Sequence, residues 1–140
     1  MRRRKAREYV LQFLFQSDFG DKGDIGRSLS QFWADKEKDD EVKKFAIEII
    51  KGTISDLDEI DSAINKSAEN WVIQRMAAVD RNILRFAVYE VLYRKDIPTA
   101  VTINEAIEIA KRYSTSESAA FINGILDKIA KGTKSQQKKA

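Results

Sequence analysis

Residues 80–91 read DRNILRFAVYEV, and this stretch decides the fold class because its apolar side chains recur at helical spacing. The apolar positions on one face are Ile83, Leu84, Ala87, Val88 and Val91. Asp80 is placed to cap the start of this helix, where a carboxylate can accept from free backbone N–H groups. We expect the helix to end before Asp96-Ile97-Pro98, because proline disfavours helical backbone in the residue that precedes it.

The same helical spacing continues upstream of this stretch. Three helices are expected there, over about Arg3 to Ser17, from Ile25 to Trp33, and from Asp39 to about Ser67. Gly52 marks a candidate kink or division in the third helix, because glycine is a poorer helix former than alanine by about 1 kcal/mol.

Two more helices are expected downstream of Pro98. Thr102 with Glu105, and Ser114 with Glu117, have the spacing of capping boxes that open them. Gly124, in the middle of the last helix, indicates the close approach of a neighbouring helix. No stretch of the chain alternates apolar and polar residues as a strand would, so the sequence predicts an all-α fold.

The chain has the length of a single domain, because 140 residues bury roughly two thirds of the surface that they expose when unfolded. Its expected helices form two groups, with no Pro-, Gly- or Ser-rich linker between them. We therefore predict one domain over 1–140, with an N-terminal helical subdomain over about 1–67, a C-terminal helical subdomain over about 68–131, and a basic tail over 132–140.

Cysteine and histidine are both absent from the sequence. Their absence excludes disulfides, thiolate or imidazole metal sites, and Ser-His-Asp or Cys-His catalysis. We expect neither a metal nor a cofactor, and no enzymatic activity. No apolar run approaches the roughly 20 residues that span a bilayer, which predicts a cytoplasmic protein without a membrane partner.

The positive charges gather at the two ends of the chain. Residues 1–8 hold five Lys or Arg against one Glu, and residues 128–140 hold five Lys and no acid. The other 119 residues have 15 bases and 21 acids, so a mildly acidic body carries basic ends. This distribution favours a localised contact with a polyanion.

The basic cluster at the N-terminus comprises Arg2-Arg3-Arg4-Lys5 and Arg7 on the first turns of the opening helix. A helix N-terminus carries partial positive charge, so cations there weaken the helix unless an external anion compensates them. Nucleic-acid phosphate is a natural anion for arginine, whose planar fork donates two hydrogen bonds. The alternative is a solvated basic end that has no ligand.

Aromatic residues beside these cations have two interpretations. Tyr9, Leu11 and Phe15 lie off the apolar stripe of the opening helix, where an exposed ring could stack on a base, although a wide core face is the simpler explanation. Phe121, in the first turns of the last helix, lies either near a bound anion or in the core.

Four ordered blocks of the chain resemble the NusB transcription antitermination family. They are the basic opening from Arg3 to Glu8 with Gln12 to Gln16, the segment from Arg75 to Glu90, Ile97-Pro98 with Val101 to Lys111, and Ser118 to Lys128. The blocks span essentially the whole chain, and four in this order are far more specific than any one of them.

The resemblance implies a fold of two packed three-helix bundles and a role without catalysis. It implies binding of the single-stranded boxA element of ribosomal RNA leader transcripts, together with the ribosomal protein NusE. The two proteins would act within an RNA polymerase complex that contains other Nus factors.

Matching residue by residue carries the family's sites onto this chain. The residues expected to bind RNA are Arg3, Arg4, Lys5 and Arg7 through phosphates, Phe15 by stacking where the family often has tyrosine, and Ser118 and Phe121 beside the RNA path. The residues expected to face the NusE partner are Asp80, Arg81 and Glu117.

Two alternatives stay open at this point. A NusB-like domain also precedes the catalytic domain of some RNA cytosine methyltransferases, although nothing in this sequence resembles a cofactor-binding domain. The chain could also be a protein-only adaptor whose basic end ignores RNA. The sequence does not decide between a monomer and a homodimer formed through the basic face.

Overall fold

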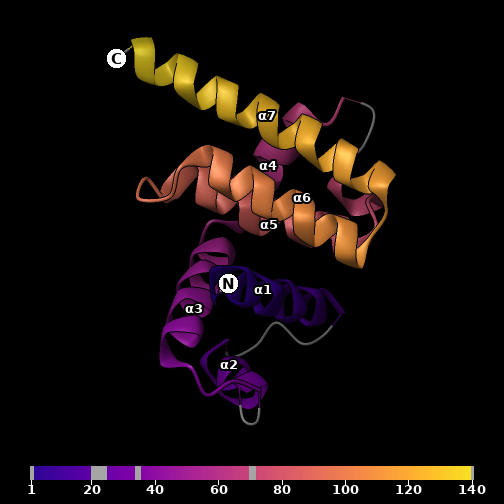
Figure 1. Cartoon of the computed structure of the whole chain (residues 1–140). Helices are drawn as coiled ribbons and strands as arrows, with labels where there is room; N and C mark the ends of the chain where they lie inside the picture. The colour runs from indigo at the N-terminus through magenta and orange to yellow at the C-terminus, as the bar shows by residue number, and fades with distance from the viewer. Residues whose placement is uncertain (1, 20–24, 34–35, 70–71, 140) are drawn as a thin grey trace.

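The computed structural model describes residues 2–19, 25–33, 36–69 and 72–139, with backbone alone for residues 19 and 134–139. Within these ranges every regular element is a helix (Figure 1). The α-helices are α1 (Arg2–Phe19), α2 (Ile25–Trp33), α3 (Asp40–Ser55), α4 (Leu57–Ser67), α5 (Ala78–Tyr93), α6 (Thr99–Tyr113) and α7 (Ser116–Lys139), and a 3₁₀ turn, η1, covers Ile73–Arg75. The all-α prediction is confirmed.

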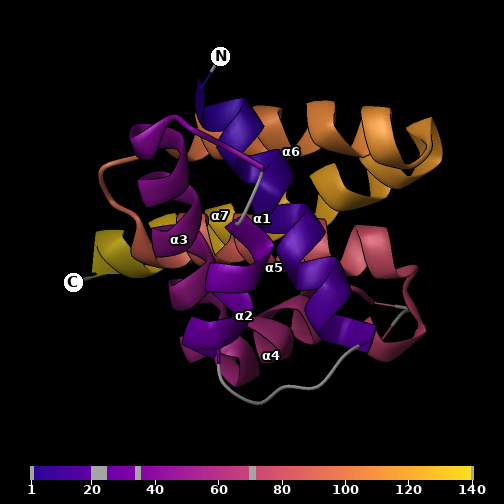
Figure 2. The same cartoon turned by 90° about the horizontal axis from the view of Figure 1, so that it is seen from below.

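The helices form two groups that meet along α5. Helices α1, α2 and α3 make the first group, and α5, α6 and α7 make a second three-helix bundle (Figures 1 and 2). Helix α4 packs mainly on α5 and α7 and makes less contact with α3. By its contacts, α4 therefore belongs with the second group, and the division into subdomains at about residue 67 stays a prediction.

Helix α5 is the centre of the core, because it contacts α1, α3, α4, α6 and α7. All five apolar positions predicted for its buried face are covered, with exposed fractions of 0–6%. One continuous apolar core joins both groups. At the far end of the chain, α7 runs on to Lys139 through most of the predicted basic tail, and Ala140 lies outside the described residues.

Two predicted helix caps are wrong, because the polar residues concerned have tertiary partners instead. Helix α5 begins after Ala77, and Asp80 lies inside its first turn. Helix α6 begins at Thr99, directly after Pro98, and the buried Thr102 hydroxyl donates to Glu90 Oε1 at 2.9 Å.

The cap predicted for α7 is displaced by one residue. The Thr115 hydroxyl oxygen accepts from the backbone N–H of Ser118 at 3.0 Å, which is the N-cap contact expected of Ser114. The Ser114 hydroxyl instead donates to Asp80 Oδ1 at 2.8 Å. A hydrogen bond between helices has replaced the local one.

Helix α3 begins where the sequence predicts, because Asp39 caps it by accepting from the backbone N–H of Glu41 at 3.0 Å. The stretch predicted as one helix from Asp39 to about Ser67 is two, α3 and α4, and the division falls at Asp56, while Gly52 lies within α3. A Cβ atom at this position would lie 2.1 Å from Cζ of the Tyr89 ring, so glycine allows the α5 side chain to lie against the α3 backbone.

Gly124 differs from Gly52 in its surroundings. It is exposed, and a Cβ atom there would have no neighbour within 4 Å. The prediction that a neighbouring helix approaches Gly124 closely is therefore wrong.

The two glycines predict opposite effects of the same substitution. Gly52→Ala should lower the free energy of unfolding by about 1 to 2 kcal/mol, because overlap with the Tyr89 ring outweighs the better helix propensity of alanine. Gly124→Ala should raise it by up to about 1 kcal/mol. Urea unfolding of both variants measures the difference, and Gly52→Ala in a Tyr89→Ala background should no longer destabilise. A stabilised Gly52→Ala single variant would contradict the packing role.

Candidate nucleic-acid interface

One side of α1 faces solvent along its whole length. The described side chains that are exposed on it are Arg2, Lys5, Gln12, Phe15 and Gln16, while Arg4 is half-buried at its edge. Arg3 is exposed as well, but it lies seven residues before Val10, on the side of α1 that packs against the core, and contacts Phe45 of α3. Phe15 is 38% exposed, so an aromatic ring does lie at the surface of this helix. The opposite side of α1 is in the core and leaves this face for a ligand.

Three cations on and beside this face form ion pairs with carboxylates of other segments. Lys5 Nζ lies 2.8 Å from Glu37, Arg4 Nε lies 2.6 Å from Glu105 on α6, and Arg112 Nη1 on α6 lies 2.9 Å from Glu8 on α1. In each pair the cation is the more exposed partner. The exposed fractions of cation and carboxylate are 57% and 8% for Lys5–Glu37, 34% and 18% for Arg4–Glu105, and 67% and 14% for Arg112–Glu8.

Glu37, the partner of Lys5, accepts the most hydrogen bonds of these three carboxylates. Glu37 accepts from Lys5 and from the backbone N–H groups of Lys38 and Asp39. The pKa of Glu37 is lowered to about 2, first by the hydrogen bond from Lys5 and then by that from Asp39. The Tyr9 hydroxyl donates to Glu37 and to the carbonyl of Lys36, which ties this loop to α1.

Arg2 and Arg3 contact α3 and the residue that caps it. Arg2 pairs with Asp39 at 3.2 Å and with Glu41 at 2.6 Å. The Arg3 guanidinium lies 4.5 Å from the centre of the Phe45 ring, a cation–π distance, and stays exposed. The basic cluster is thus ordered against the protein and presented outward.

Arg7 was predicted to hold phosphate, and this prediction is wrong. Its side chain is 2% exposed, and its Nε and Nη2 atoms donate to both oxygens of the buried Glu90 at 2.9 and 2.7 Å. Thr102 of α6 donates to the same carboxylate. Arg7 therefore joins α1 to α5 and α6, and the two nitrogens with which it would bind a phosphate already donate to Glu90.

Asp80 and Arg81 were predicted to face a protein partner, and the structure turns both inward. Asp80 is 8% exposed, and its two oxygens accept from the hydroxyls of Ser114 and Ser118 at 2.8 Å each. Arg81 donates from Nε to Asp18 at 3.1 Å, and its Nη1 lies 3.4 Å from three carbonyl oxygens around η1. The prediction for the buried Asp80 is therefore wrong, whereas a partner contact through the partly exposed Arg81 stays a prediction.

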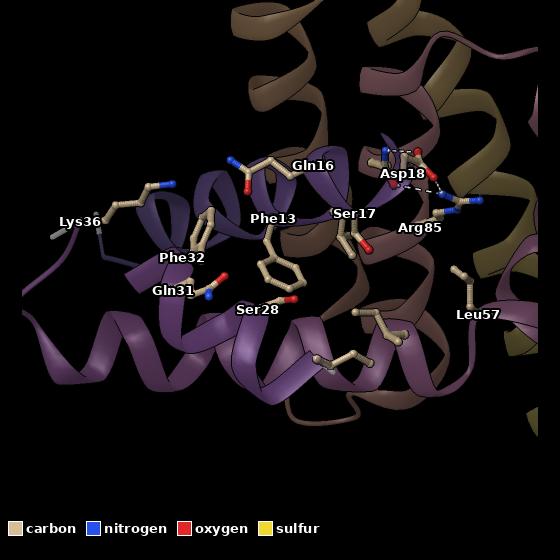
Figure 3. Close-up of a pocket in the computed structure, with 14 residues that line it drawn as sticks. Phe13, Gln16, Ser17, Asp18, Ser28, Gln31, Phe32, Lys36, Leu57 and Arg85 are labelled. Atoms are coloured by element: carbon tan, nitrogen blue, oxygen red, sulfur yellow. Dashed lines mark hydrogen bonds and ion pairs between the residues drawn. The ribbon is translucent and has the colours of Figure 1, made fainter. Parts of the chain in front are cut away.

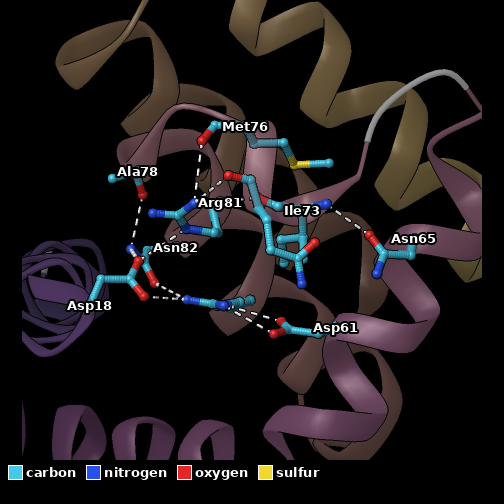
Figure 4. Close-up of polar contacts among 10 residues, drawn as sticks. Asp18, Asp61, Asn65, Ile73, Met76, Ala78, Arg81 and Asn82 are labelled. Carbon is cyan, nitrogen blue, oxygen red and sulfur yellow. Dashed lines mark hydrogen bonds and ion pairs between the residues drawn. The ribbon is translucent and has the colours of Figure 1, made fainter. Parts of the chain in front are cut away.

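Sequence reasoning missed the polar network to which Arg81 belongs (Figure 4). Asp18 also accepts from Asn82 at 2.6 Å and from Arg85 at 2.9 Å, and Arg85 makes a two-point contact with Asp61 at 2.9 and 3.0 Å. Burial would raise the pKa of Asp18, but the hydrogen bonds from Asn82 and Arg85 lower it. The network fastens the end of α1 to α4 and α5.

The remaining predicted residues lie around the start of α7. The Ser118 hydroxyl is held by Asp80, Phe121 is half-buried against the core, and Glu117 is exposed. The end of α1 and the start of α7 both contact the first turn of α5, through Asp18 and Ser118 respectively. The structure therefore brings this group to the Phe15 end of α1, while the cations occupy the other end.

A cavity of about 410 Å³ opens on the other side of α1, next to α2 (Figure 3). Phe13 and Phe32 form its apolar wall, and Asp18 with Arg85 closes one end. These two charged groups are paired with each other, and Lys36, at the opposite end, lies 3.7 Å from the centre of the Phe32 ring. The cavity thus presents no poised acid and base for catalysis.

A family model described as the NusB family matches residues 4–131. The chain belongs to the NusB family. It is 53% identical to the transcription antitermination protein NusB of Thermodesulfovibrio yellowstonii, over 94% of this chain and 93% of that protein. It is 49% identical to the NusB of Desulfitobacterium hafniense, over 99% and 95% of the two chains. These relatives are transcription antitermination proteins, so the family is not one of enzymes.

Solved structures agree with the NusB assignment. The T. maritima NusB structure superposes with a TM-score of 0.83 at 46% identity, covering 92% of this chain and 90% of that one. A structure of the antitermination factors NusB and NusE in complex with dsRNA also gives a TM-score of 0.83, at 26% identity, covering 94% and 97%.

In this NusB-family chain the buried Arg7–Glu90 pair predicts a large loss of stability on truncation. Arg7→Ala should lower the free energy of unfolding by about 3 to 5 kcal/mol, because Glu90 would stay buried without its counter-charge. Arg4→Ala removes the neighbouring two-point pair, which is more exposed, and should lower it by about 1 kcal/mol or less. Denaturant unfolding followed by circular dichroism compares the two, and equal losses would argue against the distinction.

The Lys5–Glu37 pair predicts a change in a single titration. A lowered carboxyl pKa stabilises the fold above the pKa of the unfolded chain, and this stabilisation is lost as pH falls toward the folded value of about 2. Lys5→Ala removes the largest cause of the shift, so the pKa of Glu37 should rise toward 4.5. NMR titration of the Glu37 carboxyl carbon measures it, with Lys131→Ala as control. An unchanged Glu37 pKa in Lys5→Ala would contradict the pairing.

Proposed function

We propose that this chain is a transcription antitermination factor that binds the single-stranded boxA element of ribosomal RNA leader transcripts. It would do so in the cytoplasm together with the ribosomal protein NusE, within an RNA polymerase complex that contains other Nus factors. The observation that carries the proposal is that Arg4, Lys5 and Arg112, on and beside α1, are each more exposed than the carboxylate with which they pair. A ligand that approaches from solvent meets the cations first.

The phosphate-binding residues in this proposal are Arg3, Arg4 and Lys5. Lys5 and Arg3 are exposed, and Arg4 is a third exposed, so all three can donate to phosphate oxygens. Arg7 is left out because it is buried: its side chain is 2% exposed and its fork is filled by Glu90, whereas Arg4, whose fork also contacts Glu105, is a third exposed. The carboxylates beneath the cations order their side chains in advance, which lowers the entropy lost on binding.

Base recognition is assigned to the other end of α1. Phe15 is partly exposed on this face, and Phe121 and Ser118 lie at the start of α7 beyond it. Stacking on aromatic rings requires unpaired bases, which favours single-stranded RNA over a duplex. Glu117, exposed in the same turn, is retained as a contact to NusE.

The similar NusB–NusE–dsRNA structure supports NusE and RNA as partners of this chain. The relatives are NusB proteins that this chain matches over 93–95% of their length, which favours antitermination over the methyltransferase-related role. A homodimer formed through the basic face would compete with RNA, so the two states should exclude each other in solution.

A protein-only adaptor is the second candidate, and one observation favours it. Within the part of the chain that the structure describes, each cation of the pairs Arg4–Glu105, Lys5–Glu37 and Arg112–Glu8 is already neutralised. Phosphate would have to compete with these carboxylates. An adaptor would bind NusE with the same affinity whether RNA is present or absent.

The deciding experiment measures binding of a short boxA RNA and of a scrambled RNA at about 0.15 M salt, where nonspecific phosphate attraction is weakened. Fluorescence anisotropy with and without NusE, and size exclusion to follow the oligomeric state, give the readouts. We expect a preference for boxA that strengthens with NusE. Equal, weak binding of both RNAs even with NusE would leave the adaptor.

The phosphate assignment predicts a change in salt dependence. The plot of log K against log salt has a negative slope, and Arg4→Ala combined with Lys5→Ala should make it less steep by about 1.4. Each lost phosphate contact on a single strand removes about 0.7. The charge-matched control, Lys128→Ala combined with Lys131→Ala, also removes two cations, but on α7, where they pair with Glu69 and Asp127. A double variant with the wild-type slope would place the phosphates elsewhere.

A further inference from the structure

A hollow of about 420 Å³ lies between α1 and α6 on the exposed side of the molecule. Its walls are formed by Arg4, Lys5, Glu8, Tyr9, Gln12 and Arg112. The Arg4–Glu105 and Glu8–Arg112 pairs bridge the two helices and set the spacing of the walls. This volume is in the range of sites that hold groups the size of one nucleotide.

Two side chains at the end of α6 are organised here by one carboxylate. Glu8, 14% exposed, accepts from Arg112 Nη1 at 2.9 Å and from the Tyr113 hydroxyl. The Arg112 guanidinium lies 5.3 Å from the centre of the Tyr113 ring. Arg112 is 67% exposed and Tyr113 is 40% exposed, so a covered acid holds a cation and an aromatic ring at the surface.

The donors of Arg112 are only partly used. Among the described residues Glu8 contacts Nη1, and no acceptor lies against Nε or Nη2. These two nitrogens form one edge of the planar guanidinium, the edge that binds phosphate through two hydrogen bonds. The negative end of the α6 dipole stabilises a cation at this position, but it does not explain the exposed tyrosine or the shared carboxylate beneath both.

The hollow lies between the two parts of the proposed RNA site, which are the basic cluster at the start of α1 and the residues around Phe15 at its other end. Glu8 follows Lys5 by three residues and precedes Phe15 by seven, which is about 4.5 and 10.5 Å along the helix axis. After Tyr113 the chain turns through Ser114 and reaches Ser118 at the start of α7. Arg112 and Tyr113 thus lie between the basic cluster and the residues around Phe15.

We propose that Arg112 and Tyr113 form a further nucleotide subsite, in which Arg112 binds one RNA phosphate and the Tyr113 ring stacks on the adjoining base. The inference rests on the proposed function and deepens it, because it adds α6 to a site assigned to α1 and the start of α7. Gln12, exposed on the opposite wall of the hollow, is placed to hydrogen-bond the edge of that base.

The test uses the full chain and a set of boxA RNAs, each with one uncharged methylphosphonate linkage. In the wild type, neutralising the linkage that Arg112 holds weakens binding. Arg112→Ala should weaken binding of the unmodified RNA by about tenfold and make the slope of log K against log salt less steep by about 0.7. In that variant the same linkage should lose its effect, because the charge pair is already broken.

Tyr113 has a separate readout. Tyr113→Leu should weaken RNA binding by about tenfold, whereas Tyr113→Phe, which keeps the ring, should bind more tightly than the leucine variant. A 2-aminopurine base placed next to the sensitive linkage should be quenched on binding to the wild type and less so on binding to Tyr113→Leu. Equal quenching would overturn the stacking role.

Lys111→Ala is the matched control. Lys111 belongs to the same last turn of α6 and is 56% exposed, but it pairs with Glu108 at 3.6 Å, lines a neighbouring hollow, and has no contact with Glu8 or Tyr113 among the described residues. Circular dichroism confirms the fold of each variant. If the wild type binds RNA, Arg4→Ala with Lys5→Ala weakens it, and Arg112→Ala does no more than Lys111→Ala, the subsite is overturned and the proposed function stands. If the wild type itself shows no RNA binding, both fail.

Discussion

The buried contact of Arg7 with Glu90 and Thr102 is the interaction on which the rest of the structure depends. It joins α1, α5 and α6 with one guanidinium, one carboxylate and one hydroxyl, all essentially excluded from solvent. A charge pair at such depth is stable only when its hydrogen-bond geometry is satisfied, so it specifies one register of α1 on the second helical group. That register decides which side of α1 faces solvent. The Asp18 network makes the same connection at the other end of the helix, so α1 is held at both ends.

The exposed face extends this use of charge from the core to the surface. Carboxylates of Glu8, Glu37 and Glu105 lie beneath cations of neighbouring segments and stay largely covered. Together with the Arg2–Asp39 and Arg7–Glu90 pairs, these carboxylates reduce the repulsion that a bare cluster of five positive charges would create near the helix N-terminus, where the α1 dipole opposes them. It also orders the cations toward solvent. The consequence is a surface that is electrically balanced in the free protein and yet presents its positive charge outward, which suits selective binding better than indiscriminate attraction to polyanions.

Particular residues show how far the sequence predicts this site. The apolar spacing around Ile83 and Leu84 identified the central helix correctly, and the clustering of basic residues identified the end of α1 at which cations are exposed. The assignments of Arg7 and Asp80 failed, because charge composition does not distinguish a charged group that faces solvent from one that has a buried partner. One signal was present for Arg7. Glu90 lies seven residues after Ile83 and three after Ala87, on the core face of its helix, where a buried carboxylate requires a partner. Nothing comparable marks Asp18 or Asp61.

The sequence by itself determined the all-α class, the approximate limits of most helices, and the separation of a basic end from an acidic body, although it joined α3 and α4 into one helix. These properties depend on residues within a few positions of one another, so periodicity and local charge are enough to reveal them. Only the tertiary structure decided where each helix is capped, which glycine admits a neighbouring ring, and which cations are free to meet a ligand. The physical reason is sequence distance: the partner of Arg7 lies 83 residues away and that of Arg4 lies 101 residues away. Such pairs form only once packing has brought the helices together, so the local sequence pattern does not predict them.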